Sequence, residues 1–201
     1  MIAALLPFAL TMAIPPLTDD APRKWNFDDQ PVGKLAAGFT AHGGNWAVVA
    51  PDHGKALAQS GQYERSAFSL VLVDDTNAKD VDVSVRFESV GGEGDRGGGV
   101  VFRASDEKNY YIVRYSDSED NFRLWKMVGG KRSLVATANI PRKAGWHTIR
   151  ARMTGDHLVA DYDGKTYLDV HDSALTAAGK IGLWTKGDAQ TRFDDLELIG
   201  H

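Results

Sequence analysis

Apolar and polar residues alternate along most of the chain from Trp25 onward. In the segment 81–88 (VDVSVRFE), every odd position is apolar and every even position is polar. A period of two is typical of a strand with one buried face and one solvated face. Similar runs predict further strands at 99–105, 109–117, 121–128, 132–138, 146–153, 157–162, 165–170, 180–186 and 191–199.

Turn residues separate several of these runs. Gly129-Gly130, Thr154-Gly155-Asp156 and Asp163-Gly164 predict tight hairpins, the last with a type I′ turn. No segment carries a sustained apolar stripe with helical spacing, and only 172–178 (DSALTAA) suits a helical turn. Folds that need crossover helices are therefore excluded. The pattern predicts an all-β jelly-roll sandwich of two antiparallel sheets.

Composition limits the classes of function. The 201 residues include 23 Lys and Arg against 27 Asp and Glu, a net charge of -4, so the chain lacks the basic surface of a nucleic-acid-binding protein. The absence of cysteine excludes disulfides, thiolate zinc sites and cysteine nucleophiles. The length suits one domain with a single core.

The N-terminal segment 2–14 (IAALLPFALTMAI) is nearly all apolar and uncharged. It is too short to span a bilayer comfortably and most resembles the core of a secretory signal, although no Lys or Arg precedes it and Pro7 interrupts it. We expect residues 1–21 to be a signal peptide or a disordered N-terminus, and 22–201 to be a single jelly-roll domain that is secreted or periplasmic. A buried N-terminal segment is the alternative.

The alternation also gathers arginines and aromatic residues on one outer sheet face. The residues expected to point outward there are Arg103, Tyr110, Arg114, Arg123, Trp125, Trp184 and Lys186. Aromatic rings stack on the apolar faces of sugar rings, and arginine donates to their hydroxyl groups. This combination favours a carbohydrate-binding groove, although Trp125 and Trp184 suit the edge of a core equally well.

Several motifs lack the structural context that their chemistry needs. Residues 92–97 match G-x-G-x-x-G, but a strand and not a helix is expected to follow, so a nucleotide site is disfavoured. The six histidines form no H-E-x-x-H or H-x-H pair, and no G-x-S-x-G elbow is present. The E-x-D-x-(x)-E strand of glycoside hydrolase family 16 is also missing.

Three groups of titratable residues remain open to more than one interpretation. The acidic loop 117–120 joins two strands of the expected groove and is either solvated or engaged with a ligand. His147 is either a core histidine or an acid/base group in the groove. Asp194, together with Asp28, is a candidate for a structural calcium ion, and plain capping or hydrogen bonding explains Asp194 equally well.

The segments 97–132, 146–164 and 179–198 resemble a bacterial domain family named for 3-keto-disaccharide hydrolase. The features that carry the resemblance are FR, NYY-x-x-R, EDN, GKR, GLWTK-x-D and FDDL in this order, and the similarity covers roughly residues 25 to 199. Ser118 departs from the more usual apolar residue before EDN. The resemblance implies a concanavalin A-like, laminin-G-like jelly roll that acts on glycosides oxidised at C3.

Such a reaction needs one base and one group that stabilises an enolate, because a ketone at C3 acidifies the C2 proton and allows elimination of the C1 oxygen. The resemblance thus points to Glu119 as the base and to Arg103 and Arg114 as the stabilising cations, with His147 as a further candidate. A divalent cation can replace an arginine in this role. The expected substrate-positioning residues are Tyr110, Asn121, Arg123, Trp125, Trp184, Lys186 and Asp188.

Three classes of function follow from this reading. The first is a hydrolase that cleaves an oxidised glycoside by elimination and hydration, and the second is a non-catalytic carbohydrate-binding module. The third is a structural or protein-interaction sandwich. A carboxylate buried beside arginines in the groove favours the first class, aromatic residues without such a carboxylate favour the second, and a groove filled by its own loops favours the third. The sugar, the linkage and the oligomeric state are left open.

Overall fold

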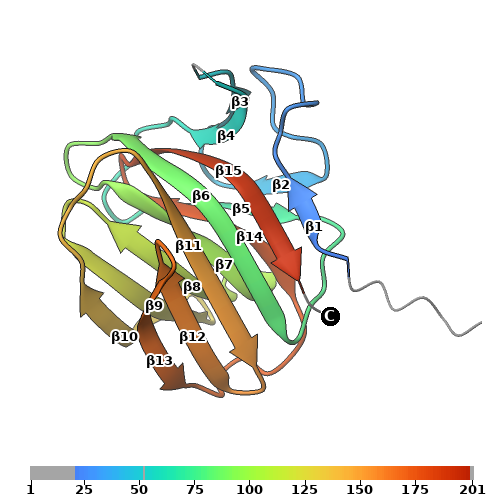
Figure 1. Cartoon of the computed structure of the whole chain (residues 1–201), viewed down its shortest axis with the longest axis vertical. Coiled ribbons are helices and arrows are strands. Elements are labelled where there is room, and N and C mark those ends of the chain that lie inside the picture. The colour runs from blue at the N-terminus through green and yellow to red at the C-terminus, as the bar shows by residue number, and fades with distance from the viewer. Residues whose placement is uncertain (1–20, 52, 200–201) are drawn as a thin grey trace, which may run out of the picture.

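Two antiparallel sheets pack face to face in the computed structural model, which describes residues 21–51 and 53–199 (Figure 1). This part of the chain contains strands and no helix, which confirms the predicted all-β sandwich. The described residues accordingly include no helix long and apolar enough to cross a membrane. The apolar segment 2–14 and the signal peptide expected there lie outside the described residues.

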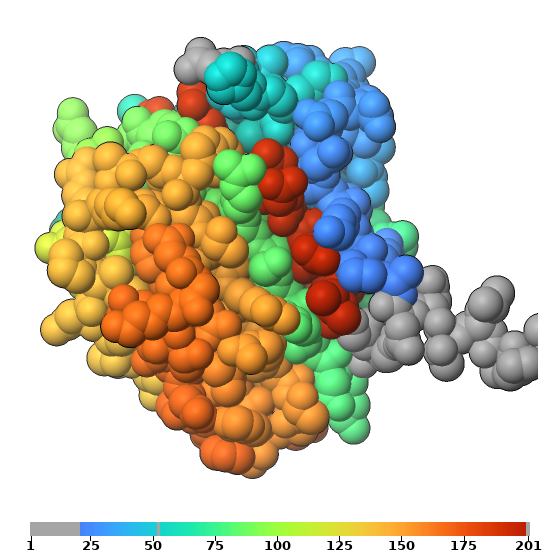
Figure 2. All heavy atoms as spheres, viewed as in Figure 1, coloured from blue at the N-terminus to red at the C-terminus, as the bar shows by residue number. Residues whose placement is uncertain are grey.

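The front sheet, nearer the viewer in Figure 1, has the strand order β13-β12-β11-β6-β15-β4-β3, with β1 paired to β15. Its strands are β1 (Arg23–Trp25), β3 (Trp46–Val49), β4 (Ala56–Gln59), β6 (Val81–Gly91), β11 (Trp146–Thr154), β12 (His157–Tyr162), β13 (Lys165–His171) and β15 (Gln190–Ile199). Figure 2 shows the outer face of this sheet, with β11 to β13 in orange beside β6 in green and β15 in red.

The back sheet has the strand order β10-β9-β8-β7-β14-β5-β2. Its strands are β2 (Phe39–His42), β5 (Phe68–Val73), β7 (Gly97–Asp106), β8 (Asn109–Ser116), β9 (Asn121–Val128), β10 (Lys131–Asn139) and β14 (Lys180–Lys186).

The main core lies between the two sheets and follows the predicted alternation. Val83, Val85 and Phe87 of β6 point into it from the front sheet, and Val100 and Tyr111 enter it from the back sheet. These five side chains are almost completely buried. The residues between them on β6 face outward, as a half-buried strand requires.

The predicted hairpins are also present. Asp163 and Gly164 have φ angles of 49° and 76°, and a type I′ turn requires positive φ at both central positions. Gly129 and Gly130 connect β9 to β10 with φ angles of 56° and 77°. The segment 172–178 contains no helical turn, contrary to the one helical element considered from the sequence.

The sequence pattern missed the strands β1 to β5. Strand β5 shows why: five of its six residues are buried, and its sequence, FSLVLV, does not alternate between apolar and polar residues. A strand covered on both sides reads as a continuous apolar run and lacks the period of two.

Arg103 does not lie in the groove, where the sequence pattern placed it. The pairing between β7 and β8 shifts register between Phe102 and Asp106, and Arg103 itself has a φ of 49°. Residues 103–105 of β7 lie opposite the single residue Tyr110 of β8, and an irregularity of this bulge type changes the direction in which a side chain points. The alternation that predicts an outward position therefore fails at this residue.

The Arg103 side chain instead ties three loops together inside the molecule. Its Nε donates to the carbonyl of Lys79 at 2.6 Å, Nη1 to that of Leu175 at 3.0 Å, and Nη2 to that of Gly155 at 2.8 Å. The side chain is 1% exposed, and its only salt bridge among the described residues is a 3.4 Å contact with the partly exposed Asp80. Arg103 is thus a structural residue, and its expected role in stabilising charge on a substrate is not supported.

Replacing Arg103 by Met should destabilise the domain strongly, because three carbonyl groups lose a buried charged donor. We expect a loss of about 3 kcal/mol, which corresponds to a melting temperature lower by about 6–12 °C for a domain of this size. Thermal unfolding followed by circular dichroism measures the change. The half-exposed Arg142, as Arg142→Ala, is the control and should change little. If Arg103→Met had an unchanged melting temperature but impaired ligand binding, Arg103 would be a binding residue and not a structural one.

Candidate functional site

The outer face of the back sheet, called the groove face below, carries a second apolar cluster separate from the main core. Its buried members are Leu70, Leu72, Val101, Ala104, Tyr110, Ile112, Met127 and Trp184, with Phe68 and Trp125 packed against them. An antiparallel sheet commonly leaves one face to solvent. This sheet is instead covered on both faces over its central strands.

The groove face is concave, as the position of Arg132 demonstrates. The Arg132 guanidinium from β10 lies 4.3 Å from the centre of the Trp125 ring on β9 and 5.0 Å from that of Phe68 on β5. In the sheet order β9 and β5 are four strand spacings apart, roughly 19 Å on a flat sheet. Side chains from the two margins meet over the central strands because the sheet curves.

This curvature corrects the expectation that Tyr110 and Trp184 expose flat apolar surface. Both point to the groove face as predicted, but they are only 1% and 3% exposed and form its floor. Burial raises the pKa of Tyr110 to about 12, so its hydroxyl stays protonated. Trp125 is half-buried at the margin, and of the two tryptophans it is the one more available to a ligand.

A pocket opens at one end of the groove face, called the Arg114 pocket below. Strands β7, β8 and β14 and the loops β6–β7 and β14–β15 line it. The lining residues are Asp95, Arg96, Gly97, Arg114, Tyr115, Ser116, Trp184, Lys186 and Ala189. The pocket therefore combines an aromatic wall with acidic and basic side chains.

Arg114 is held in this pocket by the acidic loop that follows β8. Its Nη1 donates to Asn121 Oδ1 at 2.9 Å, and its Nη2 donates to Glu119 Oε2 at 2.8 Å. Arg123 donates to the same Glu119 oxygen at 2.9 Å, and Asn121 Nδ2 does so at 3.1 Å. The structure thus brings together Arg114, Glu119, Asn121 and Arg123, four of the residues predicted from the sequence.

This clamp keeps Glu119 ionised. Burial raises the pKa of the carboxyl. The hydrogen bonds from Arg114 and Asn121 and the charges of Arg114 and Arg123 have a larger effect in the opposite direction, so the pKa falls to about 2. All these bonds go to Oε2, and no described residue donates to Oε1. The second oxygen can therefore accept a hydrogen bond from a ligand.

Asp95 and Lys186 form the opposite wall of the pocket. Lys186 Nζ lies 3.0 Å and 3.2 Å from the two Asp95 carboxylate oxygens, and Arg65 Nε lies 3.8 Å from one of them. Asp95 is only 7% exposed, so this buried carboxylate is compensated by cations. Lys186 was predicted from the sequence, whereas Asp95 was noted only as part of the unproductive G-x-G-x-x-G match.

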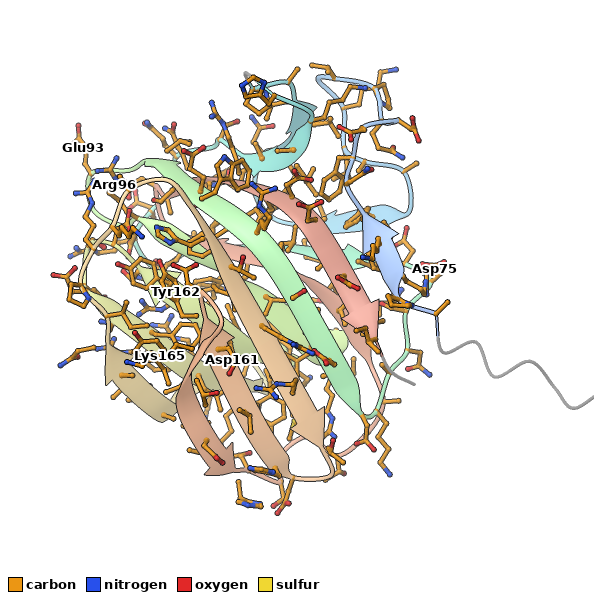
Figure 3. All side chains as sticks on the ribbon, in the orientation of Figure 1. Asp75, Glu93, Arg96, Asp161, Tyr162 and Lys165 are labelled. Atoms are coloured by element: carbon orange, nitrogen blue, oxygen red, sulfur yellow. The ribbon has the colours of Figure 1, made fainter. Side chains whose placement is uncertain are left out.

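Asp188 supports the pocket without lining it. Its carboxylate accepts hydrogen bonds from the backbone N–H groups of Glu93 at 2.6 Å, Gly94 at 3.0 Å and Asp95 at 2.8 Å. These bonds lower the pKa of Asp188 to about 2. These three N–H groups belong to the β6–β7 loop, which also carries Arg96; Glu93 and Arg96 are labelled at the upper left of Figure 3. Asp188 therefore fixes the loop that positions Asp95, rather than contacting the Arg114 pocket directly.

Arg132 belongs to the groove face and was not among the residues predicted. It is half-buried between Trp125 and Phe68, and among the described residues it makes no salt bridge and its buried Nη1 has no hydrogen-bond partner. Burial lowers its pKa, while the charges of Glu119 and Asp95 act in the opposite direction. The only signal in the sequence was its place in the GKR motif.

His147 lies on the front sheet and acts as a core histidine. Its Nδ1 bonds with Asp163 Oδ2 at 2.8 Å, and its Nε2 bonds with the carbonyl oxygen of Lys143 at 2.8 Å. Its ring stacks on Tyr162, which is labelled in the left half of Figure 3. Both ring nitrogens are engaged and the residue is 5% exposed. The alternative role of His147 as an acid/base group in the groove is therefore not supported.

Asp28 and Asp194 do not form a calcium site by themselves. Asp28 Oδ1 accepts from the backbone N–H of Lys55 at 3.0 Å, and Asp194 Oδ1 accepts from that of Asp195 at 2.7 Å. Burial and the charges of Asp195 and Asp28 raise the pKa of Asp194. Across residues 21–51 and 53–199 no group of three or more His, Asp or Glu side chains is arranged to hold a metal ion. A calcium ion takes six to eight oxygen ligands, so a site at Asp28 and Asp194 would need further oxygens from backbone carbonyls or waters.

The clamp predicts how Glu119 affects stability as a function of pH. A carboxyl with a lowered pKa contributes stability above its unfolded value near 4.5, and this contribution disappears as the pH falls towards about 2. Glu119→Gln should therefore be less stable than the natural protein at pH 7, and the difference should shrink between pH 4.5 and pH 2. Denaturant unfolding at several pH values measures it. A difference independent of pH would contradict the ionised clamp.

Comparison with protein families identifies the chain. Residues 26–199 match the model of the 3-keto-alpha-glucoside-1,2-lyase-like domain. This match covers most of the sequence, so the chain belongs to that family, and the resemblance inferred from the sequence is confirmed. No curated protein matches the chain.

Solved structures with the same fold include several carbohydrate-related proteins. The carbohydrate-binding module CBM66 from Bacillus subtilis is 23% identical, with a TM-score of 0.68 over 79% of this chain and 93% of that one. A Bacillus subtilis protein of unknown function with a galectin-like fold is 14% identical, with a TM-score of 0.63 over 81% and 89%. A GH16 protein of the Bacteroides ovatus mixed-linkage glucan PUL is 10% identical, with a TM-score of 0.63 over 88% and 99%. At these identities the likeness confirms the jelly-roll fold.

Proposed function

We propose that this member of the 3-keto-alpha-glucoside-1,2-lyase-like family binds a glycoside on the groove face, over the mouth of the Arg114 pocket, and cleaves its 3-keto form by elimination and hydration. The pocket itself has a free volume of about 20 Å³, so polar groups of the ligand and not a whole sugar ring enter it. The observation that carries the proposal is that Asp95, Arg114 and Lys186 line one pocket beside Trp184. A carboxylate can accept a proton and two cations can stabilise an enolate, while the buried indole of Trp184 closes the apolar floor beneath them. The membership of the family supports this assignment.

The reaction requires only proton transfer and charge stabilisation. A carboxylate takes the proton from C2, the C–H electron pair forms the enolate of the C3 ketone, and the cations stabilise the oxygen that gains charge. The enolate then expels the C1 oxygen, a double bond forms between C1 and C2, and the leaving alkoxide takes a proton from solvent. Addition of water, with hydroxide at C1 and a proton at C2, completes the cleavage.

Asp95 suits the role of the base better than Glu119, which the sequence pointed to. A carboxyl with a pKa of about 2 is a weak base, and the Oε2 atom of Glu119 already accepts three hydrogen bonds. Asp95 lines the pocket itself. In this proposal Glu119 fixes Arg114 and accepts a substrate hydroxyl through Oε1.

A second candidate function is sugar binding without cleavage. It is favoured by the ion pairs of the pocket, because Asp95 with Lys186 and Glu119 with Arg114 are each compensated within 3.0 Å. An ion-paired carboxylate already has its oxygens engaged by the cation and is less available to take a proton from a substrate. The likeness of the fold to the module CBM66 fits this alternative.

Asp95→Asn should reduce turnover of a 3-keto-glucoside by about 10² to 10⁴, the usual contribution of a general base, while the fold is retained. Glu119→Gln should mainly raise KM, since it loses a binding contact. The measurement is product release from 3-keto-glucosides and from their unoxidised parents. The exposed Asp169, as Asp169→Asn, is the matched control on the far margin of the front sheet and should behave like the natural protein.

Two results would redirect the assignment. Turnover that survives in Asp95→Asn but is lost in Glu119→Gln would make Glu119 the base. Release from neither form of sugar, with binding that calorimetry detects in the natural protein and not in Arg114→Ala, would establish the binding-module function.

A further inference from the structure

Positive charge on the groove face exceeds the carboxylates that pair with it. The pairs around the Arg114 pocket are Glu119 with Arg114 and Arg123, and Asp95 with Lys186 and Arg65. Each carboxylate thus already serves two cations. Arg132 forms no salt bridge in the described part of the chain, and neither does Arg96, which lines the pocket. The surface is therefore positive although the whole chain has a net charge of -4.

Arg132 is also short of hydrogen-bond acceptors. Its guanidinium lies 4.3 Å from the centre of the Trp125 ring and 5.0 Å from that of Phe68, and its Nη1 is buried without a partner. Aromatic rings stabilise the positive charge, but they do not provide the oxygen acceptors that the N–H groups have in water. Arg132 is therefore a partly desolvated cation that can gain a great deal from an anion.

The charge of Arg132 acts on the same area as the Arg114 pocket. The carboxylates of Glu119 and Asp95 raise its pKa without forming a salt bridge with it, so both lie within electrostatic range. The acidic residues Glu64, Glu93 and Asp188 line a neighbouring hollow, and none of them is paired with Arg132. A ligand over the mouth of the pocket consequently meets an arginine that no described carboxylate occupies.

We propose that the groove face selects a glycoside that carries a carboxylate, and that Arg132 binds this group. The inference rests on the proposed function, which places the sugar on the groove face. The reaction proposed there uses the cations of the pocket, Arg114 and Lys186, and a neutral sugar gives Arg132 no acceptor of opposite charge.

The shape of the guanidinium favours a carboxylate. Its N–H donors lie in one plane and form a fork that matches the two oxygens of a planar carboxylate. The rings of Trp125 and Phe68 lie against this guanidinium, so we expect the anion to approach its edge. Among sugars, a uronic acid unit supplies such a group. The preferred ligand class is accordingly a glycoside that contains a uronic acid.

A titration followed by NMR tests the assignment, because shifts of the backbone and indole N–H signals report weak binding and locate it. The probes are methyl glucoside, methyl glucuronoside and methyl glucoside 6-sulfate, each in both anomeric forms and none of them oxidised at C3. We expect the glucuronoside to bind at least about tenfold more tightly than the glucoside at low salt, since a charged hydrogen bond is gained. This preference should shrink when the salt concentration rises from about 20 mM to about 500 mM.

Two variants that lose the same charge are compared. Arg132→Gln should lower the affinity for the glucuronoside to about that of the glucoside. Lys131→Gln is the matched control and should keep the preference, because Lys131 is the exposed neighbour of Arg132 and points to the opposite side of strand β10. Melting temperatures establish that both variants are folded.

The outcomes separate this inference from the proposed function. Equal affinity for the glucoside and the glucuronoside, or a preference that survives in Arg132→Gln, would overturn the carboxylate site and leave the proposed function in place. Binding of the 6-sulfate as tight as that of the glucuronoside would overturn the assignment to a uronic acid. If no probe shifts the groove-face signals of the folded natural protein, the proposed function and this inference both fail.

Discussion

The curvature of the back sheet is the constraint on which the candidate site depends. It allows Trp125 and Arg132 from one margin to reach Phe68 from the other, so that the central strands are buried on both faces. Gly99 of β7 leaves no room for a side chain beside β8, since a Cβ there would lie 2.4 Å from the carbonyl oxygen of Val113. The result is a closed apolar floor that leaves an opening at the end occupied by Arg114.

At that opening the charges are arranged in advance of any ligand. Arg114 shares Glu119 with Arg123, and Asp95 is paired with Lys186, so each buried charge has a partner within 3.0 Å. Such an arrangement costs little reorganisation when a ligand binds, which is how preorganised polar sites achieve binding and catalysis. Arg132 differs from these residues, since no carboxylate pairs with it in the described part of the chain, and its charge is compensated by two aromatic rings.

The outer face of the front sheet provides an internal comparison. It also carries ion pairs, such as Arg150 with Asp82 and Arg86 with Asp195, but the arginines in these pairs are 44% exposed. Exposed pairs of this kind contribute little and can be exchanged for solvent contacts. The difference between the two faces within the described residues is therefore one of burial: the groove face combines charged side chains with a buried apolar floor, whereas these pairs of the front sheet are exposed.

The sequence by itself determined the strands from β6 to β15, the hairpins and the face to which Tyr110, Arg114, Arg123 and Trp184 point. These features depend on local patterns, namely a period of two and the turn residues, so no knowledge of neighbouring strands is needed. Motifs in the sequence also indicated the family.

Only the tertiary structure decided that Tyr110 and Trp184 are buried. It also decided that Arg103 and His147 lie away from the groove face and have structural roles. It placed Asp95 in the Arg114 pocket and Arg132 on the groove face. Each of these depends on which strands lie side by side, on a bulge after Phe102, or on how far the sheet curves. Such contacts join residues far apart in the chain, and a pattern that is read residue by residue carries no information about them.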